Sequence, residues 1–232
     1  MSNSRHSARA PIRARTTGKT VSGREVLQAR GVHDRRLLST IEAVPAQLFG
    51  LNPQGQPASD DAGRSQVPLT ALVALMVQAL ELRGNERVLD IGTGSGYQAA
   101  LLGRLASQVY SVELDPRTSE AAARKLEKLG LSNVHVATGD ASRGWPSAAP
   151  YDAIIVGAAS PDIPRELIDQ LDEGGRLVIA VGDQYCQLVE RLTKKRQVLE
   201  SEVVTWCTLP PLVFAAAPPP SSRPWMKASQ NP

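Results

Sequence analysis

The segment VLDIGTGSGY, residues 88–97, joins a short run of strand-forming residues to a turn with three glycines in five positions. Glycine reaches positive φ angles without strain, so Gly92, Gly94 and Gly96 predict a sharp turn whose backbone is left uncovered. A helix that starts directly after such a turn offers free N–H groups. The segment therefore predicts a strand, a turn and a helix that together receive a phosphate or a nucleoside.

Strands and helices are expected to alternate on both sides of this turn. The run AIIV, residues 153–156, is continuously apolar, as in strands that are buried on both faces. Strands are expected at 87–91, 108–113, 134–137, 151–156 and 176–181, with helices at 97–106, 116–129 and 164–171, and a terminal antiparallel pair at 187–192 and 198–206. This order predicts a doubly wound α/β fold, with a mostly parallel seven-stranded sheet covered by helices on both faces.

The chain of 232 residues divides by composition into one domain and two tails. Residues 1–23 are expected to be a basic, flexible tail, and residues 215–232 a Pro-rich, disordered one. The domain between them, residues 24–214, begins with a helical part up to residue 82 that includes a helix over 68–82. The α/β core follows over 83–214.

Charge and hydropathy exclude several classes of function. Residues 1–38 carry nine Lys and Arg against two acidic residues, whereas the domain is mildly acidic, which argues against a groove for a specific nucleic acid. No apolar run reaches 18 residues, so no membrane span is expected. Residues 1–24 lack the apolar region of a secretory signal, although their Ser and Arg content also fits a transit peptide. We expect a cytoplasmic monomer. We also expect no metal site, because neither the cysteines nor the histidines have the spacing of metal ligands.

Three other motifs can be compared with the glycine turn. A P-loop requires a first glycine where this chain has Arg13, upstream of Gly18-Lys19-Thr20. A nucleophile elbow around Ser95 would need glycine at the positions of its second neighbours, which are Thr93 and Tyr97. A dinucleotide site has the spacing GxGxxG rather than GxGxG, and only an acid at the end of the second strand, Glu113, keeps that alternative open.

Three acidic residues follow the order of the strands. Asp90 precedes the glycine turn, Glu113 ends the second strand, and Asp140 follows the third. This arrangement resembles the class I methyltransferases, which use S-adenosylmethionine. The resemblance implies that the turn faces the methionine part of the cofactor, Glu113 the ribose hydroxyls and Asp140 the adenine amino group. The implied cofactor-binding residues are Asp90, Gly92, Thr93, Gly94, Gly96, Tyr97, Glu113, Leu114, Asp140 and Ala141.

Longer stretches resemble one family, the protein-L-isoaspartate O-methyltransferases. The resemblance covers roughly residues 24–214 and is carried by ARGVHDRRLLSTIEAVPAQLF (29–49), VLDIGTGSGYQAALL (88–102), VYSVE (109–113), LGLSNVHVATGDASRGW (129–145), APYDAIIVGAA (149–159) and IPRELIDQLDEGGRLVIAVG (163–182). It implies methylation of the carboxylate of isoaspartyl residues in damaged proteins or peptides, a repair reaction. A carboxylate with a pKa of about 4 is already a nucleophile at pH 7, so no general base is needed.

The resemblance breaks down in the segment that faces the acceptor. The family carries a segment like LPIGxGQTISQP, whose serine hydroxyl lies at the substrate carboxylate, and this chain has Pro68 at that serine. Ser65 and Thr70 are the hydroxyls that could replace it as catalytic residues, although Thr70 also fits a helix cap. Gly157 stands where threonine is common. Two alternatives therefore stay open: a different carboxylate or peptide acceptor, and a descendant without catalytic activity.

Overall fold

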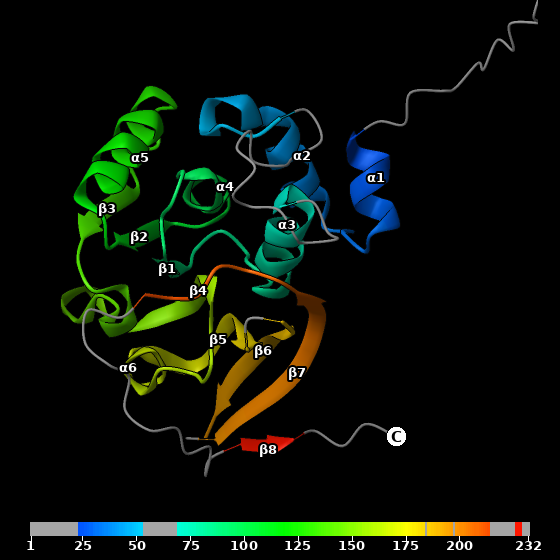
Figure 1. Cartoon of the computed structure of the whole chain (residues 1–232), viewed down its shortest axis with the longest axis vertical. Coiled ribbons are helices and arrows are strands. Elements are labelled where there is room, and N and C mark those ends of the chain that lie inside the picture. The colour runs from blue at the N-terminus through cyan, green and yellow to red at the C-terminus, as the bar shows by residue number, and fades with distance from the viewer. Residues whose placement is uncertain (1–22, 53–68, 184, 197, 214–225, 229–232) are drawn as a thin grey trace, which may run out of the picture.

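The protein is built around an eight-stranded sheet (Figure 1). The structure is a computed structural model, and it describes residues 23–52, 69–183, 185–196, 198–213 and 226–228. The strand order is β3-β2-β1-β4-β5-β6-β7-β8. The strands are β1 Arg87–Ile91, β2 Gln108–Glu113, β3 Val134–Thr138, β4 Tyr151–Ser160, β5 Leu171–Gly182, β6 Gln187–Lys195, β7 Val198–Cys207 and β8 Met226–Ala228.

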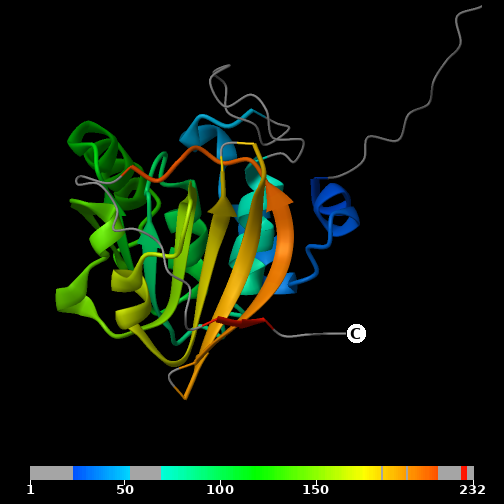
Figure 2. The ribbon, with the colours of Figure 1, turned by 60° about the horizontal axis from the view of Figure 1, so that its bottom comes forward.

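The first seven strands confirm the predicted mostly parallel sheet. Strands β1 to β5 are parallel to one another, and β6 is antiparallel to both β5 and β7. Strands β5 and β7 therefore run in the same direction on either side of β6 (Figure 2). The antiparallel pair that was expected at the end of the domain is β6 with β7.

The eighth strand corrects the expectation that residues 215–232 are disordered throughout. Residues 226–228 form β8, which pairs in parallel with β7, with Leu199 opposite Met226. Composition did not predict this strand, because pairing along a sheet edge uses backbone N–H and C=O groups, which every residue type other than proline supplies in full.

Helices cover both faces of the sheet, as predicted. They are α1 Gly23–Ala29, α2 Arg35–Ala43, α3 Leu69–Ala79, α4 Tyr97–Leu105, α5 Pro116–Lys128 and α6 Arg165–Asp169, with the 3-10 helices η1 Ala46–Phe49, η3 Ala141–Arg143 and η4 Pro146–Ala148. Helices α2 to α5 lie on one face of the sheet and α6 on the other (Figure 1).

Successive strand residues supply the two halves of the core. In β1 the fully buried Val88 packs under the helices α2 to α5, and its neighbour Leu89 packs on the α6 side. In β4 the adjacent residues Ile155 and Ile154 divide in the same way. Because side chains alternate across a strand, a strand buried on both faces needs an unbroken apolar run. The AIIV run of β4 meets this requirement.

Polar contacts hold the last turn of α3 against the segment that precedes α2. The Gln78 Oε1 atom accepts from the backbone N–H groups of His33 and Asp34 at 2.6 and 2.9 Å, and Gln78 Nε2 donates to the Gly31 carbonyl at 2.9 Å. These bonds attach α3 to the segment that leads into α2. They therefore fix the position of the last turn of α3.

Helix α3 ends at Ala79, three residues before the predicted end at 82. Glu81 leaves the helical conformation with a φ of +50° and forms ion pairs with Arg176 of β5 and Arg191 of β6. These pairs lower the pKa of the Glu81 carboxyl, chiefly through the hydrogen bond from Arg191. Periodicity did not predict this end, because the ion-pair partners lie about 100 residues along the chain.

Candidate active site

The turns after β1, β2 and β3 lie side by side at one edge of the sheet. The Gly92 N–H donates to the Val112 carbonyl at 2.9 Å, and the Gly139 N–H donates to the Glu113 carbonyl, also at 2.9 Å. The chain builds β1, β2 and β3 outward and then places β4 on the other side of β1, so the strand order reverses there. In doubly wound sheets, ligands bind beyond the carboxyl ends of the strands at such a reversal.

The glycine turn has the predicted shape, and its outer side is open. Gly92, Gly94 and Gly96 have φ angles of +84°, +52° and +90°. A Cβ atom on Gly92 would have no neighbour within 4 Å, and on Gly94 it would meet only the Gly92 carbonyl, at 3.9 Å. A Cβ on Gly96 would lie 3.2 Å from the Ala122 Cβ and 3.4 Å from the Phe49 ring. The first two glycines thus leave room for a ligand, and the third lets α5 and η1 pack closely.

Glu113 lies directly beside this turn. Its Oε2 atom accepts from the Gly94 N–H at 2.8 Å, and its Oε1 atom accepts from the Asp115 N–H at 3.1 Å. Each carboxylate oxygen can accept a further bond. The carboxylate therefore fixes the turn and stays within reach of a hydroxyl-bearing ligand that rests on Gly94.

Asp140 marks the third turn. It caps η3, where its Oδ1 atom accepts from the Ser142 N–H at 3.1 Å and from the Ser142 hydroxyl at 2.6 Å. Its side chain is half-buried, and Leu114, after β2, is partly exposed at the same edge. Ala141 is buried in the core on the α6 side, so it backs Asp140 rather than facing outward. Glu113, Leu114 and Asp140 thus lie at one edge of the sheet.

Asp90 and Thr93 lie under the turn instead of on its open side, which differs from the expected contact with a cofactor. Asp90 is fully buried, and its carboxylate accepts from Gln98 Nε2 and from the Ser111 hydroxyl, each at 2.7 Å. The Thr93 hydroxyl is bonded to the Ser111 hydroxyl at 2.6 Å. Burial raises the pKa of the Asp90 carboxyl to about 6, against the two hydrogen bonds, which lower it. These side chains shape the turn from below.

Tyr97 has its backbone in the turn and its side chain in the interior. Its backbone begins α4 directly after Gly96, whereas its ring is buried and lies 5.7 Å from the Phe49 ring, edge to face. Burial raises the pKa of the phenol to about 12. The residue therefore belongs to the turn through its N–H group and to the interior through its side chain.

Four residues near the turn were not predicted. Gln98 and Ser111 complete the network around Asp90, and Lys125 donates from Nζ to the Ser95 carbonyl at 3.2 Å while lying 5.7 Å from the centre of the Phe49 ring. The only signal for the first two was a single polar residue inside each of the apolar segments YQAALL and VYSVE. Lys125 and Phe49 gave no signal, since each meets the turn from another element.

Gly157 of β4 supports the turn from behind. A Cβ atom here would lie 3.3 Å from the Gly92 carbonyl oxygen and 3.4 Å from both Gln98 Nε2 and the Ile91 carbonyl oxygen. These contacts are tighter than most Cβ atoms make, and a β-branched side chain would add to them. Glycine in place of threonine therefore allows β4 to approach this turn closely.

The acceptor side is described only in part. Thr70 is the second residue of α3 and is half-buried. Ser65 and Pro68, the other residues singled out in this segment, lie outside the described residues. Among the residues that the structure describes, no group of three or more His, Cys, Asp or Glu side chains could hold a metal ion, and no helix is long and apolar enough to cross a membrane.

The family model for protein-L-isoaspartate(D-aspartate) O-methyltransferases matches residues 25–215. The chain belongs to this family. A protein-L-isoaspartate O-methyltransferase of Syntrophobacter fumaroxidans is 46% identical over 166 residues, which cover 69% of this chain and 78% of that protein. One of Geobacter metallireducens is 46% identical over 191 residues, covering 80% and 88%.

A solved protein-L-isoaspartate O-methyltransferase structure superposes with a TM-score of 0.68 at 28% identity. The match covers 81% of this chain and 64% of that one, so this chain spans a little under two thirds of that protein's length. Family membership and the shared fold agree with the sheet order and the glycine turn described above.

Proposed function

We propose that this protein transfers a methyl group from S-adenosylmethionine to the carboxylate of isoaspartyl residues in damaged proteins or peptides. The observation that carries this proposal is the open turn of Gly92 and Gly94, with Glu113 and Asp140 at the same edge. An uncovered backbone flanked by two carboxylates suits a ligand with an amino acid part, ribose hydroxyls and an adenine amino group. Membership in the isoaspartate methyltransferase family supports the acceptor.

Each residue of the site has a role under this proposal. Gly92, Gly94 and the N–H group of Tyr97 lie along the methionine part, with Gly96 and Thr93 keeping the turn in shape. Glu113 accepts from the ribose hydroxyls, and Leu114 presents an apolar surface to the adenine. Asp140 accepts from the adenine amino group, with Ala141 behind it. Asp90 acts on the cofactor only through the turn that it supports.

The chemistry demands few catalytic groups from the protein. When bound, S-adenosylmethionine supplies a methyl carbon on a positively charged sulfur, and the sulfur keeps the bonding electrons as the acceptor oxygen forms the ester. No proton moves, because the acceptor is an ionised carboxylate at neutral pH. The protein must align acceptor and donor and exclude water. The site offers fixed backbone and neutral hydroxyls for this task, with Thr70 and Ser65 as candidates on the acceptor side.

The deciding experiment is transfer of a labelled methyl group to a short isoaspartyl peptide, with the matching normal aspartyl peptide as control. We expect turnover on the isoaspartyl form alone. If the protein binds S-adenosylmethionine but methylates neither peptide, the departure around Pro68 has changed the acceptor or ended catalysis, and the proposal fails. We also expect a cytoplasmic monomer without a specific nucleic-acid or membrane partner, which sedimentation of the purified protein tests for the oligomeric state.

A further inference from the structure

The Tyr97 hydroxyl is a buried polar group without a partner. Tyr97 is 3% exposed, and its hydroxyl has no hydrogen-bond partner among the described residues. Leaving a buried hydroxyl unsatisfied destabilises a fold. Phenylalanine would make the same ring contact with Phe49 without this cost. The hydroxyl therefore calls for a ligand group as its partner.

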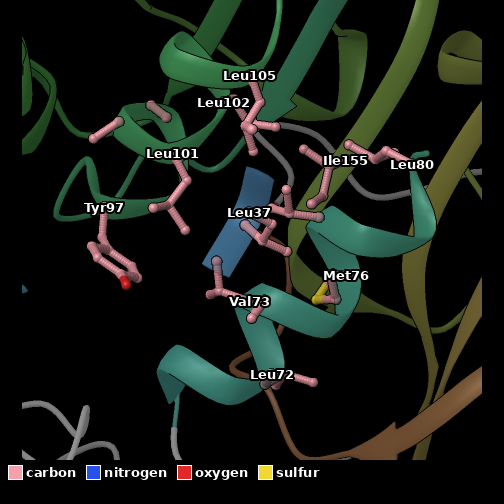
Figure 3. Close-up of a cluster of buried hydrophobic side chains, with 14 of the residues drawn as sticks. Leu37, Leu72, Val73, Met76, Leu80, Tyr97, Leu101, Leu102, Leu105 and Ile155 are labelled. Carbon is pink, nitrogen blue, oxygen red and sulfur yellow. The ribbon is translucent and has the colours of Figure 1, made fainter. Parts of the chain in front are cut away.

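The position of the ring is tightly set. It follows Gly96 directly and lies edge to face against Phe49, which itself packs against Gly96 and under the Lys125 ammonium group. The hydroxyl end of the ring extends away from α4, toward the level of Val73 on α3 (Figure 3). Helices α3 and α4 are in contact, and Val73 and Tyr97 belong to one buried cluster.

A second hydroxyl, that of Thr70, lies on the same face of α3 as Val73. Thr70 precedes Val73 by three residues, and side chains three apart lie on one side of a helix. Thr70 is half-buried in the first turn of α3, beyond Val73. Tyr97 thus follows the cofactor turn directly, and Thr70 lies in the first turn of α3, a helix that contacts α4.

We propose that the Tyr97 hydroxyl donates a hydrogen bond to the acceptor carboxylate, with Thr70 on the opposite side of that carboxylate. This inference rests on the proposed function, which supplies the carboxylate. A neutral donor on one oxygen orients the carboxylate and offsets part of its desolvation, while the other oxygen keeps its charge for attack on the methyl carbon. A lysine or arginine at this position would hold the anion more strongly and weaken it as a nucleophile.

The raised pKa of the phenol agrees with a role as a donor. Because burial raises that pKa to about 12, the hydroxyl keeps its proton near neutral pH, where the acceptor is ionised. Within the described ranges, no acidic or basic side chain is bonded to the hydroxyl that could exchange a proton with it. Its contribution is to hold the acceptor, which is a binding role.

The test compares Tyr97→Phe with Tyr151→Phe in the full-length protein. Tyr151 is also buried, but its hydroxyl already donates to the Trp145 carbonyl at 2.7 Å. For Tyr97→Phe we expect the dissociation constant of an isoaspartyl peptide from the S-adenosylhomocysteine-bound protein to rise by about tenfold to hundredfold, the range for a hydrogen bond to a charged group. The affinity for S-adenosylhomocysteine should stay unchanged. Tyr151→Phe should leave both affinities unchanged.

Unfolding in urea supplies a readout that ligands do not influence. Tyr97→Phe should leave the protein as stable as the wild type or make it more stable, because it removes an unsatisfied group. Tyr151→Phe should lower the midpoint, because it leaves the Trp145 carbonyl without its donor. A clear loss of stability in Tyr97→Phe would show that the hydroxyl has a partner within the fold, and would overturn the inference.

Two further results would overturn it: an unchanged peptide dissociation constant, and a weakened affinity for S-adenosylhomocysteine alone, which would assign the hydroxyl to the cofactor. Failure of the proposed function is a separate outcome. If the wild type binds the peptide but does not methylate it, the proposed function fails while the comparison of the two variants still decides the role of Tyr97. If the wild type does not bind the peptide, both fail.

Discussion

The buried carboxyl of Asp90 makes a quantitative prediction about stability and pH. Its pKa rises from 3.8 to about 6 in the folded protein, chiefly because burial penalises the charged form. Between these two values the folded protein binds one more proton than the unfolded chain, so the free energy of unfolding falls as pH increases. A shift of one pKa unit corresponds to about 1.4 kcal/mol, so ionisation of Asp90 removes about 3 kcal/mol of stability by pH 7.

Asp90→Asn should abolish this contribution. The amide oxygen can still accept from Gln98, and the Ser111 hydroxyl can turn to accept from the amide NH₂ while donating to Thr93. As pH rises from 4 to 7, we therefore expect the wild type to lose about 3 kcal/mol of unfolding free energy relative to the variant. Unfolding in urea at closely spaced pH values measures it.

Asp115→Asn is the matched control. Asp115 caps α5, and the hydrogen bonds from Thr118 lower the pKa of its carboxyl, so its contribution to stability is present above the unfolded pKa and is lost as pH falls. Across pH 4–7 the difference between the control and the wild type should therefore stay nearly constant, and it should shrink only at pH values below about 4. If the stability of Asp90→Asn follows that of the wild type in parallel across pH 4–7, the reasoning about burial of Asp90 is wrong.

Three further results are expected. Gly94→Asn should weaken cofactor binding at least tenfold, because its side chain enters the open side of the turn. It should cost little stability, because asparagine tolerates the positive φ of this position. Calorimetry with S-adenosylhomocysteine measures the affinity. Glu113→Ala should reduce that affinity by about 1–3 kcal/mol, whereas Glu120→Ala on the exposed side of α5 should not. Removal of residues 1–22 should leave the unfolding midpoint and methyl transfer nearly unchanged, and a large loss of activity would place the basic segment in the site.

Local patterns were enough to predict most of the fold. The strands β1 and β2 have the predicted bounds, because the turn glycines and the apolar runs mark their ends within the sequence itself. The order of strands and helices predicted the sheet, since a parallel strand needs a crossover and the helices supply it. Glu113 and Asp140 follow the second and third strands in the sequence, and these parallel neighbours bring both residues to one edge.

The direction of individual side chains could not be predicted in this way. Asp90 and Thr93 were expected at the ligand, yet both point into a network with Ser111 and Gln98. Whether a polar side chain at the end of a strand faces solvent or the interior depends on which residues of neighbouring elements can pair with it. Those partners are far away along the sequence. They come close to the turn in space only when the sheet forms.

The sequence by itself determined the order of the elements, the glycine turn and the family, because these depend on the local properties of residues in consecutive order. Only the tertiary structure decided that Phe49, Lys125 and Ala122 close around the turn, that Gly157 packs against it, and that the Tyr97 hydroxyl is buried with no hydrogen-bond partner in the part of the chain that the structure describes. Each of these facts depends on how segments that are far apart along the chain pack together. Such contacts follow from close packing, in which the space left to one side chain is defined by all of its neighbours at once.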